Sequence, residues 1–229
     1  MRVSYSTLLA IESTGAIGGV ALLQQGALLG SIRVRHGLNL SGNLLHATDW
    51  LLQRCQLTLQ QVDAFAVDVG PGSFTGLKIG VMLAKTWAHA LDKPLVAVSA
   101  FEACAALAPN ELPLLIALPA RRDALYLQWL QPEASTPAMV RQVHLPDWLA
   151  RTRPTDTSKP FIIGTAQAQE WLKPLLPDAL SQLIECPDPV GVAQAGWQRL
   201  LAGETVHPFR LTPLYIQPPS ITPPKVTKK

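Results

Sequence analysis

The sequence predicts an α/β protein of two domains that share one order of elements. Hydrophobic residues make up 48% of the 229 residues and charged residues only 15%, a composition that can build a sizeable core. Short apolar runs rich in strand formers alternate with segments in which apolar residues recur at helical spacing. The same order of elements occurs twice, which predicts domains at 1–108 and 109–207. A proline-rich tail at 208–229 follows, and its end is expected to be disordered.

The first half reads as three strands followed by alternating helices and strands. Gln25 and Gly26 form a predicted hairpin turn between the second and third strands. Ser41 is the predicted cap of the first helix, and Ser99 with Glu102 forms a capping box that begins the last one. Strands are predicted at 7–13, 19–24, 28–35, 64–69 and 95–98, and helices at 41–56, 74–91 and 99–107.

The second half repeats this order without a detectable repeat in the sequence itself. Strands are predicted at 114–118, 125–130, 139–145, 161–163 and 183–184, and helices at 146–151, 166–172 and 190–201. Two α/β halves of this order, each beginning with three strands, are typical of the actin/Hsp70/sugar-kinase (ASKHA) architecture. In that architecture two related domains flank a cleft.

A glycine-rich segment joins a predicted strand to the long predicted helix. Residues 70–80 read GPGSFTGLKIG. Backbone amides converge at a helix N-terminus, where the helix dipole is positive, so such a loop can hold an anion. Gly70, Gly72 and Ser73 are therefore candidate phosphate-binding residues. The spacing matches neither a Walker loop nor the dinucleotide fingerprint, since both fail at Thr75, and this favours the alternative, a purely structural turn.

Small residues recur every fourth position along the same helix. They are Gly72, Gly76, Gly80, Ala84 and Ala88. Each glycine inside a helix costs about 1 kcal/mol relative to alanine, so the stripe predicts a neighbour that comes very close. That neighbour is either the chain's own sheet or a helix of another subunit. A further, partly apolar face of the helix is formed by Ile79, Met82, Thr86 and His89. A helix with two such faces is expected to pack against two neighbours.

Few residues suggest catalysis or metal binding. Glu12 ends the first strand, where phosphate-transferring proteins of this architecture place a carboxylate, but no second carboxylate is evident and a structural or vestigial role is favoured. The five histidines form neither HxxxH nor HExxH, which predicts no helical metal pair. The net charge of +3 is not gathered into a basic stripe with aromatic residues, which argues against independent nucleic-acid binding.

The cysteines and the N-terminal residues predict a cytoplasmic protein. Cys55, Cys104 and Cys186 lie far apart with no CxxC pair, as expected of reduced core thiols. The first residues lead directly into a strand without the pattern of a signal peptide, and no apolar run is long enough to span a membrane.

The segment at 70–80, together with Ile11, Glu12, Ser13 and Thr14 at the end of the first strand, resembles the bacterial TsaB (YeaZ) family. The resemblance implies a non-catalytic scaffold that activates the enzyme TsaD. With TsaE, an ATPase, the two attach threonylcarbamoyl to adenosine 37 of tRNAs that read codons beginning with A. It further implies a homodimer in the absence of these partners, contact with tRNA only through the complex, and no cofactor of its own, with ATP and metal on the partner subunits.

The resemblance also implies a pairing surface on the helices at 41–56 and 74–91. The residues carried over to it are Leu45, Thr48, Leu52, Thr75, Gly76, Ile79, Gly80, Met82, Thr86 and His89. The chain departs from the family pattern at Glu12, where aspartate is more common, and at three further positions. These are Lys78 and Gln217, which replace arginine, and Pro119, which replaces aspartate.

Two other functions remain open from the sequence. A small phosphotransferase or ATPase of the same architecture would act alone and turn over ATP. A free-standing dimerisation module would use the same two helices without contacting TsaD.

Overall fold

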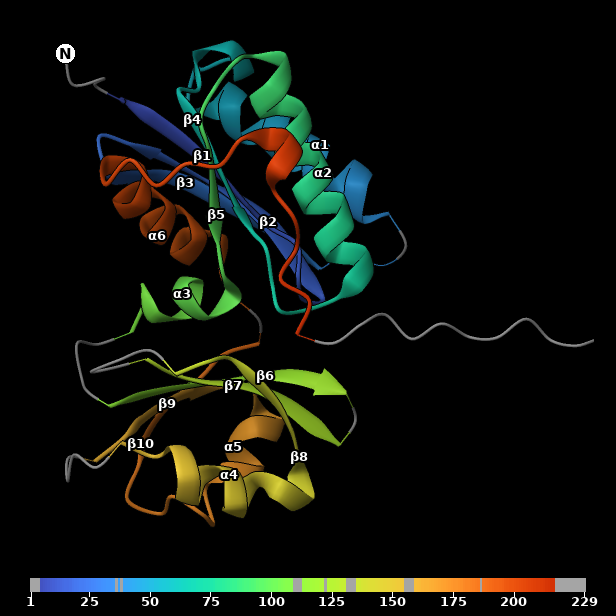
Figure 1. Cartoon of the computed structure of the whole chain (residues 1–229). Coiled ribbons are helices and arrows are strands. Elements are labelled where there is room, and N and C mark those ends of the chain that lie inside the picture. The colour runs from blue at the N-terminus through green and yellow to red at the C-terminus, as the bar shows by residue number, and fades with distance from the viewer. Residues whose placement is uncertain are drawn as a thin grey trace, which may run out of the picture.

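The computed structural model describes residues 5–35, 37, 39–108, 113–121, 123–130, 135–154, 159–185 and 187–216. Within them the chain forms two five-stranded sheets, one above the other, with the short helix α3 (Ala100–Ala105) between them (Figure 1). The strand order is β3-β2-β1-β4-β5 in the first sheet and β10-β9-β6-β7-β8 in the second. Read in reverse, the second order is β8-β7-β6-β9-β10, which matches the order of the first sheet strand by strand. The predicted duplication is confirmed.

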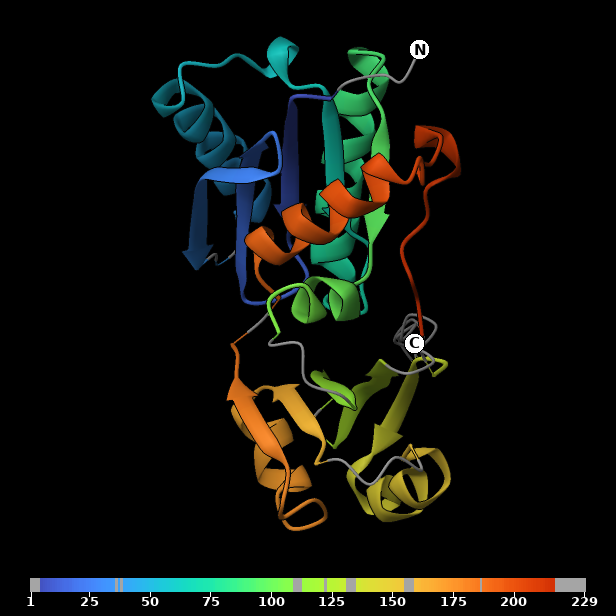
Figure 2. The same ribbon diagram turned by 90° about the vertical axis from the view of Figure 1, so that its left-hand side faces the viewer.

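The first sheet is covered on both faces. Its elements are β1 (Thr7–Glu12), β2 (Ile17–Gln24), β3 (Ala27–Arg35), α1 (Leu40–Arg54), η1 (Leu59–Gln61), β4 (Ala64–Asp68), α2 (Phe74–Ala90) and β5 (Leu95–Val98). Strand β1 pairs antiparallel with β2 and parallel with β4. Helices α1 and α2 cover one face, and α6 (Pro189–Leu201) crosses the other (Figure 2).

The second sheet has helices on one face and α3 on the other. Its elements are β6 (Leu114–Arg121), β7 (Ala124–Leu130), β8 (Ala138–Arg141), η2 (Gln142–His144), α4 (Leu145–Thr152), β9 (Phe161–Gly164), α5 (Ala166–Leu172) and β10 (Leu180–Leu183). Phe101 of α3 packs with Leu114 and Ile116 of β6, so the two halves share a hydrophobic layer.

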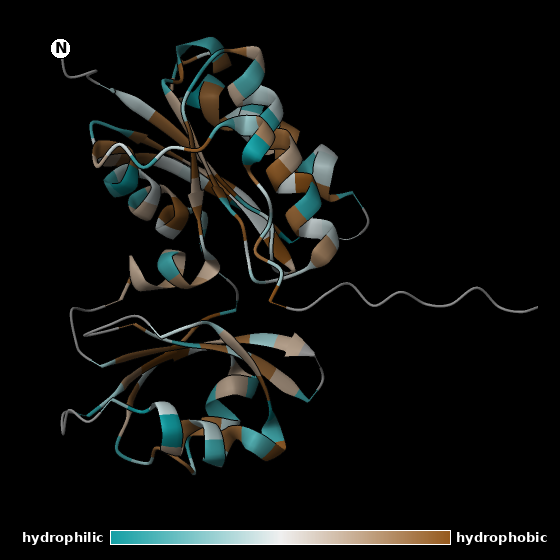
Figure 3. Cartoon of the chain, viewed as in Figure 1, coloured by the Kyte–Doolittle hydropathy of each residue, from teal (hydrophilic) through white to brown (hydrophobic). Residues whose placement is uncertain are grey.

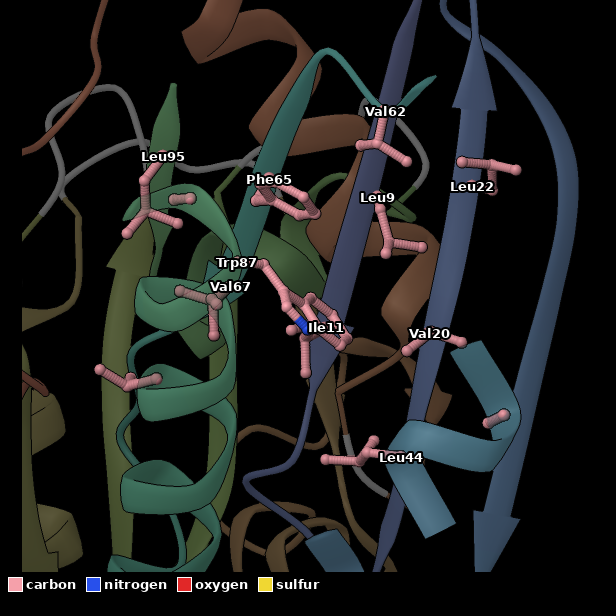
Figure 4. Packing of buried hydrophobic residues seen from close by; sticks show 14 of the residues in the cluster. Leu9, Ile11, Val20, Leu22, Leu44, Val62, Phe65, Val67, Trp87 and Leu95 are labelled. Carbon is pink, nitrogen blue, oxygen red and sulfur yellow. The ribbon is translucent and has the colours of Figure 1, made fainter. Parts of the chain in front are cut away.

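Strand β1 is apolar from Leu8 to Ile11 because both of its faces are buried. Leu9 and Ile11 point to the α1 and α2 side, whereas Leu8 and Ala10 pack toward α6. Figure 4 shows Trp87 of α2 reaching from the helix toward this strand, and its ring centroid lies 5.8 Å from that of Phe65. Figure 3 shows hydrophobic and hydrophilic residues alternating along α1 and α2, as expected for helices with one buried side.

Helix α6 belongs by packing to the first sheet, although it lies within the range 109–207 that the sequence assigns to the second domain. Its apolar face, including Val192 and Ala193, joins the cluster around Leu8. A Cβ atom at Gly196 would lie 2.6 Å from the Cβ atom of Ala66, so glycine is needed for this close approach. The boundary by chain order and the boundary by packing therefore differ here, because the chain returns to cover the open face of the first sheet.

Several predicted boundaries differ from the structure. The strand predicted at 139–145 ends at Arg141, because the next residues turn into η2 and Pro146 suits the first turn of α4. The strand predicted at 183–184 is β10, which begins at Leu180. Asn39, rather than Ser41, occupies the N-cap position of α1. The capping box at Ser99 is confirmed by both of its hydrogen bonds.

The chain after α6 returns along α2, and we call residues 206–216 the C-terminal strap. The backbone N–H of Val206 donates to Leu95 O at 2.8 Å, and that of Leu214 donates to Val69 O at 2.7 Å. Between them lies η3 (Pro208–Arg210), beside α2. The strap is the red segment in front of α2 in Figure 1. The remainder of the predicted tail, 217–229, lies outside the described residues, as does its predicted disorder.

Among the helices of the described residues, none is both long enough and apolar enough to cross a membrane.

Candidate functional site

The small-residue stripe of α2 packs on the end of β1 in the same chain. A Cβ atom at Gly76 would collide with Ser13 O, and one at Gly80 would collide with Ser13 Oγ. Ser13 Oγ also donates a hydrogen bond of 3.0 Å to Gly76 O. Of the two neighbours that the stripe predicts, the chain's own sheet is therefore the one present.

The glycine-rich loop is held by hydrogen bonds within the chain. The backbone N–H of Gly70 donates to Asp68 Oδ1 at 2.6 Å, and that of Ser73 donates to Thr14 O at 2.8 Å. Ser73 Oγ caps α2 by accepting from the N–H of Gly76 at 3.2 Å. The side chain of Thr14 fills the space beside Gly72. These contacts are those of a structural turn, and phosphate binding by Gly70, Gly72 and Ser73 stays a prediction.

Two buried carboxyl groups lie beneath this loop. Glu12 and Asp68 end the adjacent parallel strands β1 and β4, and both are fully buried. Glu12 Oε1 accepts from the backbone N–H and from Oγ1 of Thr14, each at 2.6 Å. From the sequence alone no second carboxylate is evident for Glu12. The available signal is that Asp68 also ends an apolar strand, since the carboxyl ends of neighbouring parallel strands meet at one edge of the sheet.

The two carboxyl groups share their environment and cannot both ionise easily. Burial raises the pKa of Glu12, and burial together with the adjacent Glu12 raises the pKa of Asp68 well above its usual range. The hydrogen bond between them favours the proton on Asp68. Glu12 Oε2 and Asp68 Oδ2 have no hydrogen-bond partner of fixed geometry among the described residues, and one proton shared between the two carboxyl groups would satisfy both. Asp188 and Glu102 add further negative charge nearby.

Within the described part of the chain, the pair is not joined by a third side chain that could complete a metal site. Among the described residues, no group of three histidine, cysteine, aspartate or glutamate side chains is placed to hold a metal ion. Cys55 is half-buried and Cys104 is buried. Cys186 and His36 lie outside the described residues.

The opposite face of α2 is exposed and borders a groove against α1. Because residues advance by about 100° around a helix, Thr75, Lys78, Met82, Thr86 and His89 lie on the side away from the glycines; we call them the α2 ridge. The α1–α2 groove beside this ridge has a volume of about 390 Å³. It is lined by Ser41, Leu45, Lys78, Ile79, Met82, Leu83 and Thr86. Met82 is 62% exposed and Leu45 45%, which is unusual for such apolar side chains side by side.

The structure separates the ten predicted pairing residues into two groups. Six of them have surface to offer: Leu45, Thr75, Met82, Thr86 and His89 are exposed, and Ile79 is half-buried. The other four, Thr48, Leu52, Gly76 and Gly80, are buried inside the chain. Thr48 Oγ1 donates to Leu44 O at 2.8 Å, and Leu52 belongs to the core of the first sheet. As folded, these four residues lie in the interior of the chain and not on its surface.

The remaining departures from the family pattern lie at different places. The Nζ atom of Lys78 lies 4.2 Å from the ring centroid of Phe74. Pro119 lines a pocket of about 370 Å³ between the two halves. An exposed ion pair of 2.8 Å joins Arg35 and Glu185 at the same pocket. Gln217 lies outside the described residues.

Comparison with known proteins identifies relatives over much of the chain. Residues 38–136 match the family model described as TsaD, tRNA N6-adenosine threonylcarbamoyltransferase. The Bacillus subtilis tRNA threonylcarbamoyladenosine biosynthesis protein TsaB is 33% identical over 160 residues, which are 68% of this chain and 70% of that protein. The Haemophilus influenzae protein of the same name is 34% identical over 99 residues, 43% of this chain and 42% of its own length.

Solved structures agree with these relatives. YeaZ from Pseudomonas aeruginosa superposes with a TM-score of 0.77 at 26% identity, over 92% of this chain and 99% of that one. The ethanolamine utilization protein EutJ from Carboxydothermus hydrogenoformans has a TM-score of 0.52 at 9% identity, over 86% of this chain and 91% of its own, a likeness of fold alone. The predicted two-domain ASKHA-like fold class is confirmed.

The close packing of α2 against Ser13 predicts an energetic coupling between positions 13 and 80. Gly80→Ala should destabilise the chain by about 1–3 kcal/mol, despite the helix propensity of alanine, because its Cβ atom meets Ser13 Oγ. In a Ser13→Ala background the same change should cost less, since the nearest atom is then the Cβ atom at 3.1 Å. Denaturant unfolding of the four variants measures the coupling. Gly37→Ala is the control, because the new Cβ atom would meet no described atom within 4 Å apart from those of its chain neighbours. Equal costs of Gly80→Ala in both backgrounds would contradict the packing of Gly80 against Ser13.

The carboxyl pair predicts a specific dependence of stability on pH. Because folding raises the pKa of Asp68 above its ordinary value of about 3.9, its contribution to stability is complete below that pH. This contribution falls as the pH rises toward the folded pKa, by at most about 1.4 kcal/mol per pH unit for one proton. In Asp68→Asn an amide can donate to Glu12 and accept from Gly70 without titrating. The free energy of unfolding of Asp68→Asn, measured between about pH 5 and 8, should therefore increase relative to that of the wild type as the pH rises. Parallel curves for the two proteins would exclude the shared proton.

Proposed function

Because the chain belongs to the TsaB (YeaZ) family, we propose that it is a non-catalytic subunit that docks on a TsaD-type protein. Through that contact it supports formation of N6-threonylcarbamoyladenosine at position 37 of tRNAs reading codons that begin with A. The observation that carries the proposal is the exposed, partly apolar surface formed by the α2 ridge and the α1–α2 groove, whose apolar lining is Leu45, Ile79, Met82 and Leu83.

The match to the TsaD family model supports the choice of partner. It covers residues 38–136, a range that includes both α1 and α2. A TsaD-type protein therefore carries sequence related to these helices. Two related helix pairs can meet face to face about an approximate two-fold axis, as the same patch does in a symmetric dimer. On this proposal a second copy of the chain uses the same surface when the TsaD-type protein is absent.

The interior of the first sheet supports a non-catalytic role. Glu12 and Asp68 are fully buried, share hydrogen bonds with the loops at Thr14 and Gly70, and compete for one proton. Such a pair holds the ends of two strands together. We accordingly propose that ATP and metal bind to the TsaD-type and TsaE-type proteins and that tRNA contacts this chain only through the complex. We also propose that the complex lies in the cytoplasm.

The docking surface predicts the effect of a charge placed in its centre. Met82→Arg and Leu45→Arg should each weaken binding to a TsaD-type protein by about 100-fold or more, because the interface would have to bury an unpaired charge. Titration calorimetry of the purified proteins measures the dissociation constants. Val143→Arg is the matched control, because Val143 is 72% exposed on η2 beside the second sheet.

Reconstituted tRNA modification tests the wider role. Omission of this chain should abolish or strongly reduce product, and Met82→Arg should act like omission while Val143→Arg restores product. Unchanged binding by both α1 and α2 variants, or ATP turnover by the purified chain alone, would contradict the proposal and favour a phosphotransferase.

A further inference from the structure

The α2 ridge is bordered on its second side by the C-terminal strap. Ile79 and Leu83 lie on the flank of α2 that faces the groove with α1. Lys85 lies on the other flank, where its Nζ atom donates to Leu211 O at 3.1 Å. The ridge therefore runs between α1 and the strap, and a partner protein that binds the ridge would contact both.

The strap presents aromatic rings at the two ends of the ridge. Phe209 is 68% exposed, and its ring centroid lies 4.7 Å from that of His89, a ridge residue. At the other end the rings of Tyr215 and Phe74 lie 5.2 Å apart, and Lys78 of the ridge lies over Phe74. The strap and the ridge are thus in direct contact and form one continuous surface.

Phe209 is held in its exposed position by its neighbours. It lies in the 3-10 turn η3, whose first residue is Pro208. The backbone N–H of Phe209 donates to His207 Nδ1 at 3.3 Å. Leu211, two residues later, is 4% exposed and packs in the core of the first sheet. A rigidly presented, solvent-exposed aromatic side chain loses little conformational entropy on binding, and such residues are frequent anchors in interfaces.

We propose that the C-terminal strap is the third element of the docking surface and that Phe209 inserts into an apolar site on the TsaD-type protein. The inference rests on the proposed function, because it assigns further residues to the same contact. Its support is the continuity of Phe209 with His89 and the ridge. A partner seated on Met82 and Thr86 extends over both flanks of α2, and the strap is the part of the chain that fills the second flank.

The test compares Phe209→Ser with Leu201→Ser in calorimetric binding to the TsaD-type protein. Leu201 is a matched control because it is 60% exposed at the end of α6, on the opposite face of the first sheet. We expect Phe209→Ser to weaken binding by about 10-fold or more and Leu201→Ser to change it by less than about 2-fold. Thermal unfolding of each variant shows whether it remains folded.

The outcomes separate this inference from the function on which it rests. If Met82→Arg prevents binding but Phe209→Ser leaves it unchanged, the strap is not part of the interface and only the inference fails. If neither variant affects binding, the proposed docking surface itself fails. A second measurement uses the unaltered chain. Oxidation of Phe209 by hydroxyl radicals should fall several-fold when the complex forms, and equal oxidation in the free and bound chain would overturn the inference.

Discussion

The contact between the glycine face of α2 and Ser13 fixes the rest of the proposed site. Ser13 is the first residue after β1, and its carbonyl and hydroxyl oxygens occupy the space in which side chains at Gly76 and Gly80 would lie. Because this face is closed against the sheet, only the opposite face of α2 remains for another molecule. The packing of α2 against Ser13 also determines where α1 and the C-terminal strap contact the helix, and hence where the groove and the exposed aromatic rings lie.

The carboxyl pair beneath the loop ties the ends of two strands to the turns that follow them. Strand ends that carry carboxyl groups can manage a metal and water when they face a cleft. Here Glu12 and Asp68 face each other, accept hydrogen bonds from the turns that follow them, and are shielded from solvent. Their hydrogen bonds stabilise the two turns on which α2 rests. On the proposed function, these strand ends support the exposed helix and carry out no chemistry of their own.

Much of the fold could be predicted from the sequence because the periodicities are clear. The strand–loop–helix around residues 70–80, the hairpin at Gln25 and the capping box at Ser99 were all readable from local residue types. The position of α6 was not, since its glycine and alanine residues do not say which sheet they approach. The pairing of Asp68 with Glu12 required the parallel register of two strands separated by more than fifty residues. The division of the α2 pairing residues into buried and exposed ones depended on which side of α2 faces Ser13, a choice that four-residue spacing leaves open.

The central claim is that the exposed ridge of α2, and not its glycine face, contacts the TsaD-type protein. The most direct test is photo-crosslinking from a benzoylphenylalanine introduced at position 82, with position 143 as the control. We expect a covalent product with the TsaD-type protein from position 82 and none from position 143. A complex that forms normally but gives no crosslink from position 82, or gives one mainly from position 143, would contradict it.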